Sequence, residues 1–262
     1  MNMFRSPAVG ARTTAAAGSV INADPATRIA FLRKVYTLFS GAMVVWMGTT
    51  LLVTFNEALL ARALGLMSGG FIGFILLMGA MFFLLRLTAS AGTGISLLGL
   101  GLFGILEGFL TAPLVYIALV QSSGLDMATI DGSVVLDPAM LASGSNIVTQ
   151  AFGLTLAVFG GLSTYALTTK RDFLWLRGAL WMGFFGLIAI AVMSMFGIGG
   201  GLVSGWGFSA AFVVLMGGFV LYDTQNIMKR YPENMAAAAA ATLLIDFIIM
   251  FKHILMLLMR RD

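Results

Sequence analysis

Seven stretches of apolar residues, each long enough to cross a lipid bilayer, constrain the fold of this chain more than any other feature. They lie at about 35–55, 66–85, 94–120, 146–168, 178–197, 202–228 and 236–259. The hydrocarbon core of a bilayer is roughly 30 Å thick, so a helix needs about 20 apolar residues to span it. With 60% hydrophobic and 10% charged residues, the composition lies outside the range of soluble domains. We expect an all-α polytopic membrane protein, with one domain of seven transmembrane helices over residues 31–262 in contact with the lipid bilayer.

Residues 1–30 differ from the rest of the chain because they are polar, basic and rich in small side chains. This composition predicts a disordered arm. Arg5 and Arg12 precede no apolar run of the length that a cleaved signal peptide requires. The first transmembrane helix is therefore expected to act as an uncleaved insertion signal.

Lysine and arginine gather in alternate connections between the apolar stretches, and this pattern predicts the orientation. The clustered residues are Arg5, Arg12, Arg28, Arg33 and Lys34, then Arg86, then Lys170, Arg171 and Arg177, then Lys229 and Arg230. By the positive-inside rule the N-terminus of this multi-pass protein is expected to be cytoplasmic. Because the net charge of +4 follows from this distribution, it indicates no nucleic-acid partner.

The C-terminal stretch is the least certain of the seven because an odd number of crossings puts its basic residues on or toward the outer side. The residues concerned are Lys252, His253, Arg260 and Arg261. Either the last helix crosses and its long basic side chains snorkel toward the interface, or it enters and returns to the cytoplasm. We favour the crossing.

The absence of cysteine and the single histidine exclude several kinds of site. Without cysteine there is no disulfide framework and no thiolate metal site. His253 has no second histidine with which to form a catalytic dyad or a metal cluster. Next to Lys252 and near a helix end, we expect it to be solvated or interfacial. No cofactor and no enzymatic activity are predicted.

Two aspartates, Asp223 and Asp246, lie in the last two apolar stretches and are the strongest candidates for a functional site. A carboxylate at membrane depth costs about 2.5 to 3.5 kcal/mol on insertion scales. The midpoint between the two falls beside the turn Tyr231-Pro232-Glu233-Asn234. An antiparallel helical hairpin would therefore bring both carboxyls to the same depth. Two acids facing each other in a low dielectric can share a proton or hold a cation. The alternative is a purely structural role, in which Asp223 ends a helix near the cytoplasmic surface and Asp246 hydrogen-bonds a neighbouring hydroxyl.

Arg86 and Glu107 are the remaining candidates. Arg86 ends the second apolar stretch on the side of that turn, so it is either a partner for the acid pair or an interfacial anchor. Glu107 lies near the middle of the third stretch, where an ionisable group faces the bundle interior or a water-filled cavity. We expect it to line a pore or cavity, or else to serve a structural role.

Three motifs stand out in the chain: Glu107-Gly108 in the third helix, Leu221-Tyr222-Asp223-Thr224-Gln225, and then Leu244-Ile245-Asp246-Phe247. Together they resemble the Bax inhibitor family, the transmembrane Bax inhibitor motif proteins. The resemblance covers nearly the whole chain after about residue 30. It implies a bacterial member in the inner membrane. It also implies seven helices, of which the last is central and wrapped by the other six.

For function, the resemblance implies a proton-sensitive calcium leak. In the family the two aspartates form a hydrogen-bonded pH sensor near an arginine of the second helix, and these roles fall on Asp223, Asp246 and Arg86 in this sequence. A regulatory role is the alternative, since bacterial relatives are implicated in modulating membrane proteases and the turnover of membrane proteins. An intramembrane aspartyl protease is a remote alternative, because its glycine-x-glycine-aspartate motif is absent around Asp246.

Overall fold

The computed structural model describes residues 24–67, 70–89, 92–123, 138–199, 201–203 and 205–260, with the side chains of Met67 and residues 138–145 left aside. Most of the predicted N-terminal arm lies outside this described part. The helices, in chain order, are α1 Pro25–Thr54, α2 Glu57–Met67, α3 Gly70–Thr88, α4 Thr93–Ser122, α5 Pro138–Thr168, the 3₁₀ turn η3 Leu174–Leu176, α6 Arg177–Met195, α7 Trp206–Arg230, the 3₁₀ turn η4 Glu233–Met235 and α8 Ala236–Met259.

Seven of the described helices are long and apolar enough to cross a membrane, as the sequence predicts. These are all of the α-helices except α2, a short helix that the apolar stretches did not reveal and that follows α1 after a tight turn. α8 is among the seven, so its length and composition agree with a full crossing. No strand occurs in the described residues.

α1 begins at Pro25, so the boundary expected near residue 30 falls inside a helix. Asp24 precedes the first turn, and its side chain accepts a hydrogen bond from the backbone N–H of Thr27. Proline at the first helical position is favourable because its missing N–H would have no partner there. These two residues together explain why the helix starts within the polar segment.

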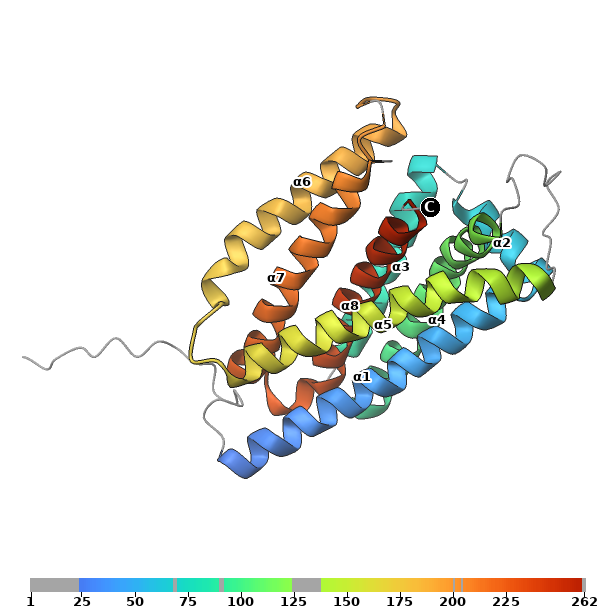
Figure 1. The fold of residues 1–262 in the computed structure, drawn as a ribbon. Coiled ribbons are helices and arrows are strands. Elements are labelled where there is room, and N and C mark those ends of the chain that lie inside the picture. The colour runs from blue at the N-terminus through green and yellow to red at the C-terminus, as the bar shows by residue number, and fades with distance from the viewer. Residues whose placement is uncertain are drawn as a thin grey trace, which may run out of the picture.

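α8 is the most deeply buried of the last three transmembrane helices (Figure 1). It packs against α1, α3, α4, α5 and α7, whereas α6 packs mainly on α7 and η3. Its first turns, Ala236–Ala241, are all buried, because methyl side chains let neighbouring backbones approach closely. The expectation that α8 is surrounded by all six other helices is not confirmed, since α6 lies at the side of the bundle (Figure 1).

One face of α8 is fixed by an aromatic cluster. Phe247 is fully buried, and its ring lies 5.5 to 6.1 Å from those of Phe39, Trp46, Phe152 and Phe159. Edge-to-face pairs at such separations stabilise a packed core beyond the burial of their area. The cluster holds α8 against α1 and α5, and successive residues on a helix are about 100° apart. The neighbouring residue, Asp246, is thereby turned toward another side of the bundle.

α4 packs against α1 through glycines. A Cβ atom on Gly108 would lie 2.6 Å from the carbonyl oxygen of Trp46 and 2.7 Å from Cβ of Thr49. The hydroxyl of Thr50 donates a hydrogen bond of 3.3 Å to the carbonyl of Gly108. This close backbone approach is the membrane counterpart of small-residue helix packing.

The variant Gly108→Ala should therefore destabilise the bundle by about 1–3 kcal/mol, because a methyl group cannot enter this contact without separating α1 from α4. Thermal unfolding in detergent micelles would measure the loss. Gly101→Ala is the matched control, since a Cβ on Gly101 meets no atom within 4 Å. Equal melting temperatures for the two variants would contradict this account of the α1–α4 contact.

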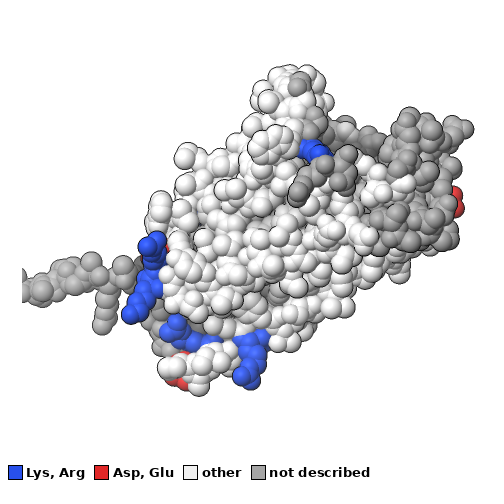
Figure 2. Space-filling model, viewed as in Figure 1, with Lys and Arg blue, Asp and Glu red and all other residues white. Residues whose placement is uncertain are grey.

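Lysine and arginine gather at one end of the bundle, which we call the basic end (Figure 2). It holds the start of α1, the end of α3, the α5–α6 connection, and the end of α7. Its basic residues are Arg28, Arg33, Lys34, Arg86, Lys170, Arg171, Arg177, Lys229 and Arg230. The structure thus brings together the connections that alternate in the sequence. The acidic loop residues Asp126, Asp131 and Asp137 lie outside the described part.

Candidate functional site

A cavity of about 340 Å³ lies between α6, α7 and α8, toward the basic end. It exists because α6 leans on α7 and leaves α8 uncovered along this side. Its lining combines apolar and polar side chains: Arg177, Trp181, Phe184, Met216, Phe219, Tyr222, Asp223, Asn226, Tyr231, Thr242, Ile245, Asp246 and Ile249. A mostly apolar cavity with a few convergent polar groups is the usual form of a binding site.

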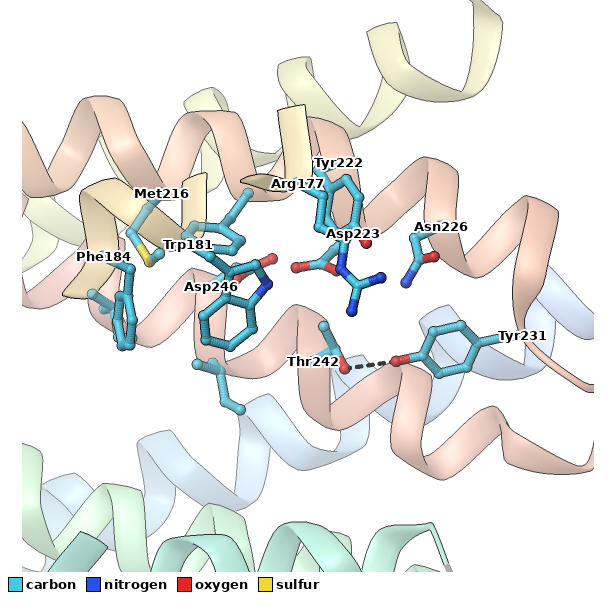
Figure 3. A pocket seen from close by; sticks show the side chains of 13 residues that line it. Arg177, Trp181, Phe184, Met216, Tyr222, Asp223, Asn226, Tyr231, Thr242 and Asp246 are labelled. Atoms are coloured by element: carbon cyan, nitrogen blue, oxygen red, sulfur yellow. Dashed lines mark hydrogen bonds between the residues drawn. The ribbon is translucent and has the colours of Figure 1, made fainter. Parts of the chain in front are cut away.

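Asp223 of α7 and Asp246 of α8 both line this cavity, and their carboxyl groups point toward one another in Figure 3. The helices run antiparallel because Pro232 cannot continue α7 and holds Tyr231 in an extended conformation. Asp223 is 8% exposed and Asp246 is 3% exposed. The Oδ2 atom of Asp246 is buried with no hydrogen-bond partner among the described residues. Such an atom favours a proton or a cation, since a bare buried carboxylate oxygen is costly.

The arginine that lines the cavity is Arg177, at the first turn of α6. Its guanidinium lies beside the carboxyl of Asp223 in the view of Figure 3. Arg86, the arginine expected from the sequence, is exposed near the end of α3 and does not line the cavity. No ion pair within 4 Å joins Arg177 to either aspartate, since the described ion pairs involve other residues. Arg177 is therefore a nearby positive charge and not a bonded partner in this conformation.

A second cavity, of about 420 Å³, continues toward the basic end and is lined partly by Arg230, Pro232 and Met235. The two cavities share Asn226, Tyr231, Thr242 and Ile245. The hydroxyls of Tyr231 and Thr242 are hydrogen-bonded at 3.1 Å. Burial raises the pKa of the Tyr231 hydroxyl, so this group keeps its proton across the physiological range. The pair forms a neutral polar contact where the cavities adjoin.

Glu107 is 4% exposed in α4 and pairs with Lys252 of α8, with 2.8 Å between Oε2 and Nζ. It lines neither of the two cavities near the acid pair. The side chain of Lys252 therefore turns inward and does not snorkel to the interface, because Glu107 supplies the opposite charge within the bundle. An acid in the third stretch and a base in the last were visible in the sequence, but their pairing was not predicted.

The expectation of a solvated or interfacial His253 is wrong. The imidazole is 9% exposed and stacks on the ring of Phe212, with centroids 4.1 Å apart and planes 4° from parallel. Phe208 adds an edge-on contact to the same ring. The histidine is buried because α7 covers this side of α8, which the position of the residue near the end of the chain did not indicate.

Two carboxylates are the acidic ligands that the cavity offers to a cation. The described residues contain no group of three or more histidine, cysteine, aspartate or glutamate side chains that could hold a metal ion. Calcium takes six to eight oxygen ligands, so an ion at Asp223 and Asp246 would need water and the oxygens of neighbours such as Asn226 and Thr242. The arrangement suits a proton or a passing hydrated ion better than a permanently bound one.

The family model described as "Inhibitor of apoptosis-promoting Bax1" matches residues 132–262, which is half of the chain and includes α5 to α8. An uncharacterized protein of Campylobacter jejuni is 35% identical over 136 residues, covering 52% of this chain and 56% of the relative. Mouse protein lifeguard 4 is 34% identical over 42% of this chain and 45% of the relative. A Golgi anti-apoptotic protein of vaccinia virus is 34% identical over 43% and 47%.

The matched regions span about half the length of these curated relatives. The family match nevertheless includes the complete α7–α8 hairpin and both of its aspartates. It agrees with the seven membrane-spanning helices and with the tyrosine-aspartate-threonine-glutamine sequence at the end of α7. This multi-pass membrane protein belongs to the Bax inhibitor family.

Proposed function

We propose that the protein is a pH-sensitive, calcium-permeable leak in which Asp223 and Asp246 act together as proton sensor and cation site. The observation that carries this proposal is the meeting of two buried carboxyls from facing helices in one cavity, with Oδ2 of Asp246 lacking a hydrogen-bond partner. Ionisable residues within a membrane are costly and are usually functional. Here the two face a cavity and not a fully packed core.

The pair couples protonation to the fit between α7 and α8. With one proton shared, the two carboxyls can attract one another. When that proton leaves, two like charges face each other in a low dielectric, and repulsion favours either separation of the helices or entry of a cation. The adjoining cavity, with its Tyr231–Thr242 contact, supports a route for ions from the basic end to the acid pair.

We place the basic end in the cytoplasm of a bacterial inner membrane. The proposal rests on the gathering of lysine and arginine at that end and on relatives from bacteria such as Vibrio cholerae and Caulobacter vibrioides. Reporter fusions at the N-terminus, in 170–177 and in the 121–145 loop would test it. A cytoplasmic signal from the 121–145 loop would reverse the orientation.

The test of function is calcium entry into proteoliposomes that contain the purified protein and a calcium-sensitive dye, measured across a pH series. We expect entry that changes with pH and exceeds that of protein-free vesicles at every calcium concentration. Entry no faster than in protein-free vesicles at any pH would reject the leak and leave the alternative, a regulatory role toward membrane proteases or membrane-protein turnover. Co-purification with a membrane protease is the corresponding test of that alternative.

A further inference from the structure

Gln225 makes the most extensive side-chain contacts of the tyrosine-aspartate-threonine-glutamine sequence, and the proposed function does not use it. It is 1% exposed on α7, two residues beyond Asp223. Its Oε1 atom accepts a hydrogen bond of 2.8 Å from the backbone N–H of Phe173. Its Nε2 atom donates to the carbonyl of Arg171 at 2.7 Å and to that of Ala166 at 3.4 Å. A single amide thus binds three backbone groups of the end of α5 and the α5–α6 connection.

A neighbouring ion pair supports the same contact. Nζ of Lys229 lies 3.1 Å from Oδ1 of Asp172 and 3.4 Å from Oε1 of Gln225. The backbone N–H of Leu174, and then Lys229, lower the pKa of the Asp172 carboxyl. Asp172 therefore stays ionised well into the acidic range, and this exposed pair persists until the pH falls through that lowered value.

α6 depends on this connection for its position. Leu180 is its only buried residue, and it rests on Gly218 of α7, where an added Cβ would lie 2.6 Å from its Cδ2. The remaining contacts of α6 are mainly with α7 and η3. Arg177 begins α6 four residues after Phe173, with only the 3₁₀ turn between them. Whatever fixes Phe173 therefore fixes where the guanidinium of Arg177 can reach.

We propose that Gln225 is a positioning residue that clamps the α5–α6 connection to α7 and so holds Arg177 beside Asp223 and Asp246. This inference rests on the proposed function of that pair as a proton sensor. A buried amide with its donor and acceptor both satisfied holds a backbone segment rigidly, because releasing it leaves polar groups unpaired. Arg177 then stabilises the ionised pair through its positive charge.

The other ionisable groups near the acid pair would remain in place when the clamp is removed. Tyr222 and Arg230 come from α7, and Tyr231 comes from the α7–α8 connection. Neither Tyr36 of α1, whose hydroxyl is buried, nor the exposed Arg86 of α3 lines the cavity of the pair. Arg177 on α6 is the group whose position the clamp controls, so its loss should be visible as a change in the titration of the pair.

The position of the connection can be measured directly because the chain contains no cysteine. Spin labels on cysteines introduced at Lys34 and at Trp175, which is 74% exposed in η3, report the distance between α1 and the start of α6. We expect a single narrow distribution in the parent protein and a broadened or displaced one in Gln225→Ala. Gln121→Ala is the control for loss of a glutamine far from the connection, since the exposed Gln121 donates a hydrogen bond of 3.1 Å to the carbonyl of Met259. An unchanged distribution in Gln225→Ala would overturn the proposal.

The effect on the acid pair is measured by infrared titration of the protonated-carboxyl band, identified by its loss in Asp223→Asn. Gln225→Ala should move the midpoint to higher pH, because the clamp no longer holds the positive charge of Arg177 at the cavity wall. Arg177→Gln should move it in the same direction, and the double variant no further than Arg177→Gln alone, because both changes remove one effect. If the connection moves but the titration midpoint does not, or if the midpoint shifts of the two variants add, Gln225 has only a structural role and does not act through Arg177.

A more conservative variant covers the case in which Gln225→Ala fails to fold. Gln225→Asn keeps a neutral amide but is one methylene shorter, so it should give an intermediate distance distribution and a smaller midpoint shift than Arg177→Gln. Parent-like values in both measurements would overturn the proposal. Neither measurement requires ion flow, so absent calcium entry would reject the leak while these results still decide the role of Gln225.

Discussion

Replacing either Asp223 or Asp246 with asparagine should largely remove the dependence of calcium entry on pH. Asparagine keeps the shape and hydrogen-bonding capacity of aspartate but cannot ionise. It therefore fixes one protonation-like state and abolishes the like-charge repulsion that we assign to the pair. Calcium entry into proteoliposomes over about pH 5 to pH 8, a range that a perturbed carboxyl can reach, measures the effect.

The two single variants should resemble the double variant. A proton shared between two carboxyls loses its function when either is replaced, so the effects of the substitutions do not add. Glu57→Gln is the surface control, because Glu57 is exposed at the start of α2, and it should retain the parent pH profile. Strictly additive effects, or a profile that both substitutions leave unchanged, would end the sensor hypothesis.

The sequence allowed the seven helices and the meeting of the two aspartates to be anticipated, because both depend on local features. The apolar stretches reveal helix number, and Pro232 marks the turn about which α7 and α8 fold back. Two residues placed symmetrically about a tight turn reach the same depth for geometric reasons. That prediction needs no knowledge of how the other helices pack.

The choice between Arg86 and Arg177 could not be made from sequence. Both lie at the basic end, near an end of a transmembrane helix. The number of membrane crossings therefore puts both arginines on the same side of the membrane and does not distinguish them. The difference arises because α6 borders the cavity and α3 does not, and that depends on how α6 leans against α7. Contacts of this kind depend on how whole helices pack together, so the local sequence pattern does not predict them.

The burial of His253 illustrates the same limit. A histidine beside a lysine near a chain end is predicted to lie at the membrane interface. In the structure, α7 instead covers this part of α8, and Phe212 stacks on the imidazole. The adjacent Lys252 is neutralised from another side, by Glu107 of α4. The sequence gives both charges, but the helical faces that bring residues 145 positions apart together come from the tertiary fold.

Removing the lysine of that ion pair should have the largest effect on stability. Lys252→Met leaves the carboxylate of Glu107, which is 4% exposed, without a partner in the bundle. Breaking a buried ion pair on one side costs about 3–5 kcal/mol, and the partial exposure of the Lys252 side chain, 23%, places the expected loss near the lower value. Unfolding of the purified protein in mixed micelles would measure it, with Lys34→Met at an exposed position of α1 as the control.

Adding Glu107→Gln to Lys252→Met should restore most of the lost stability, because the cost comes from the uncompensated charge more than from the lost attraction. The pair lies outside the cavity of Asp223 and Asp246, so the infrared titration of the aspartates should keep its midpoint in the double variant. A double variant as unstable as Lys252→Met would show that Lys252 stabilises α8 by packing and not by charge. A shifted midpoint would instead mean that the Glu107–Lys252 pair and the acid pair are coupled through α8, which carries one member of each.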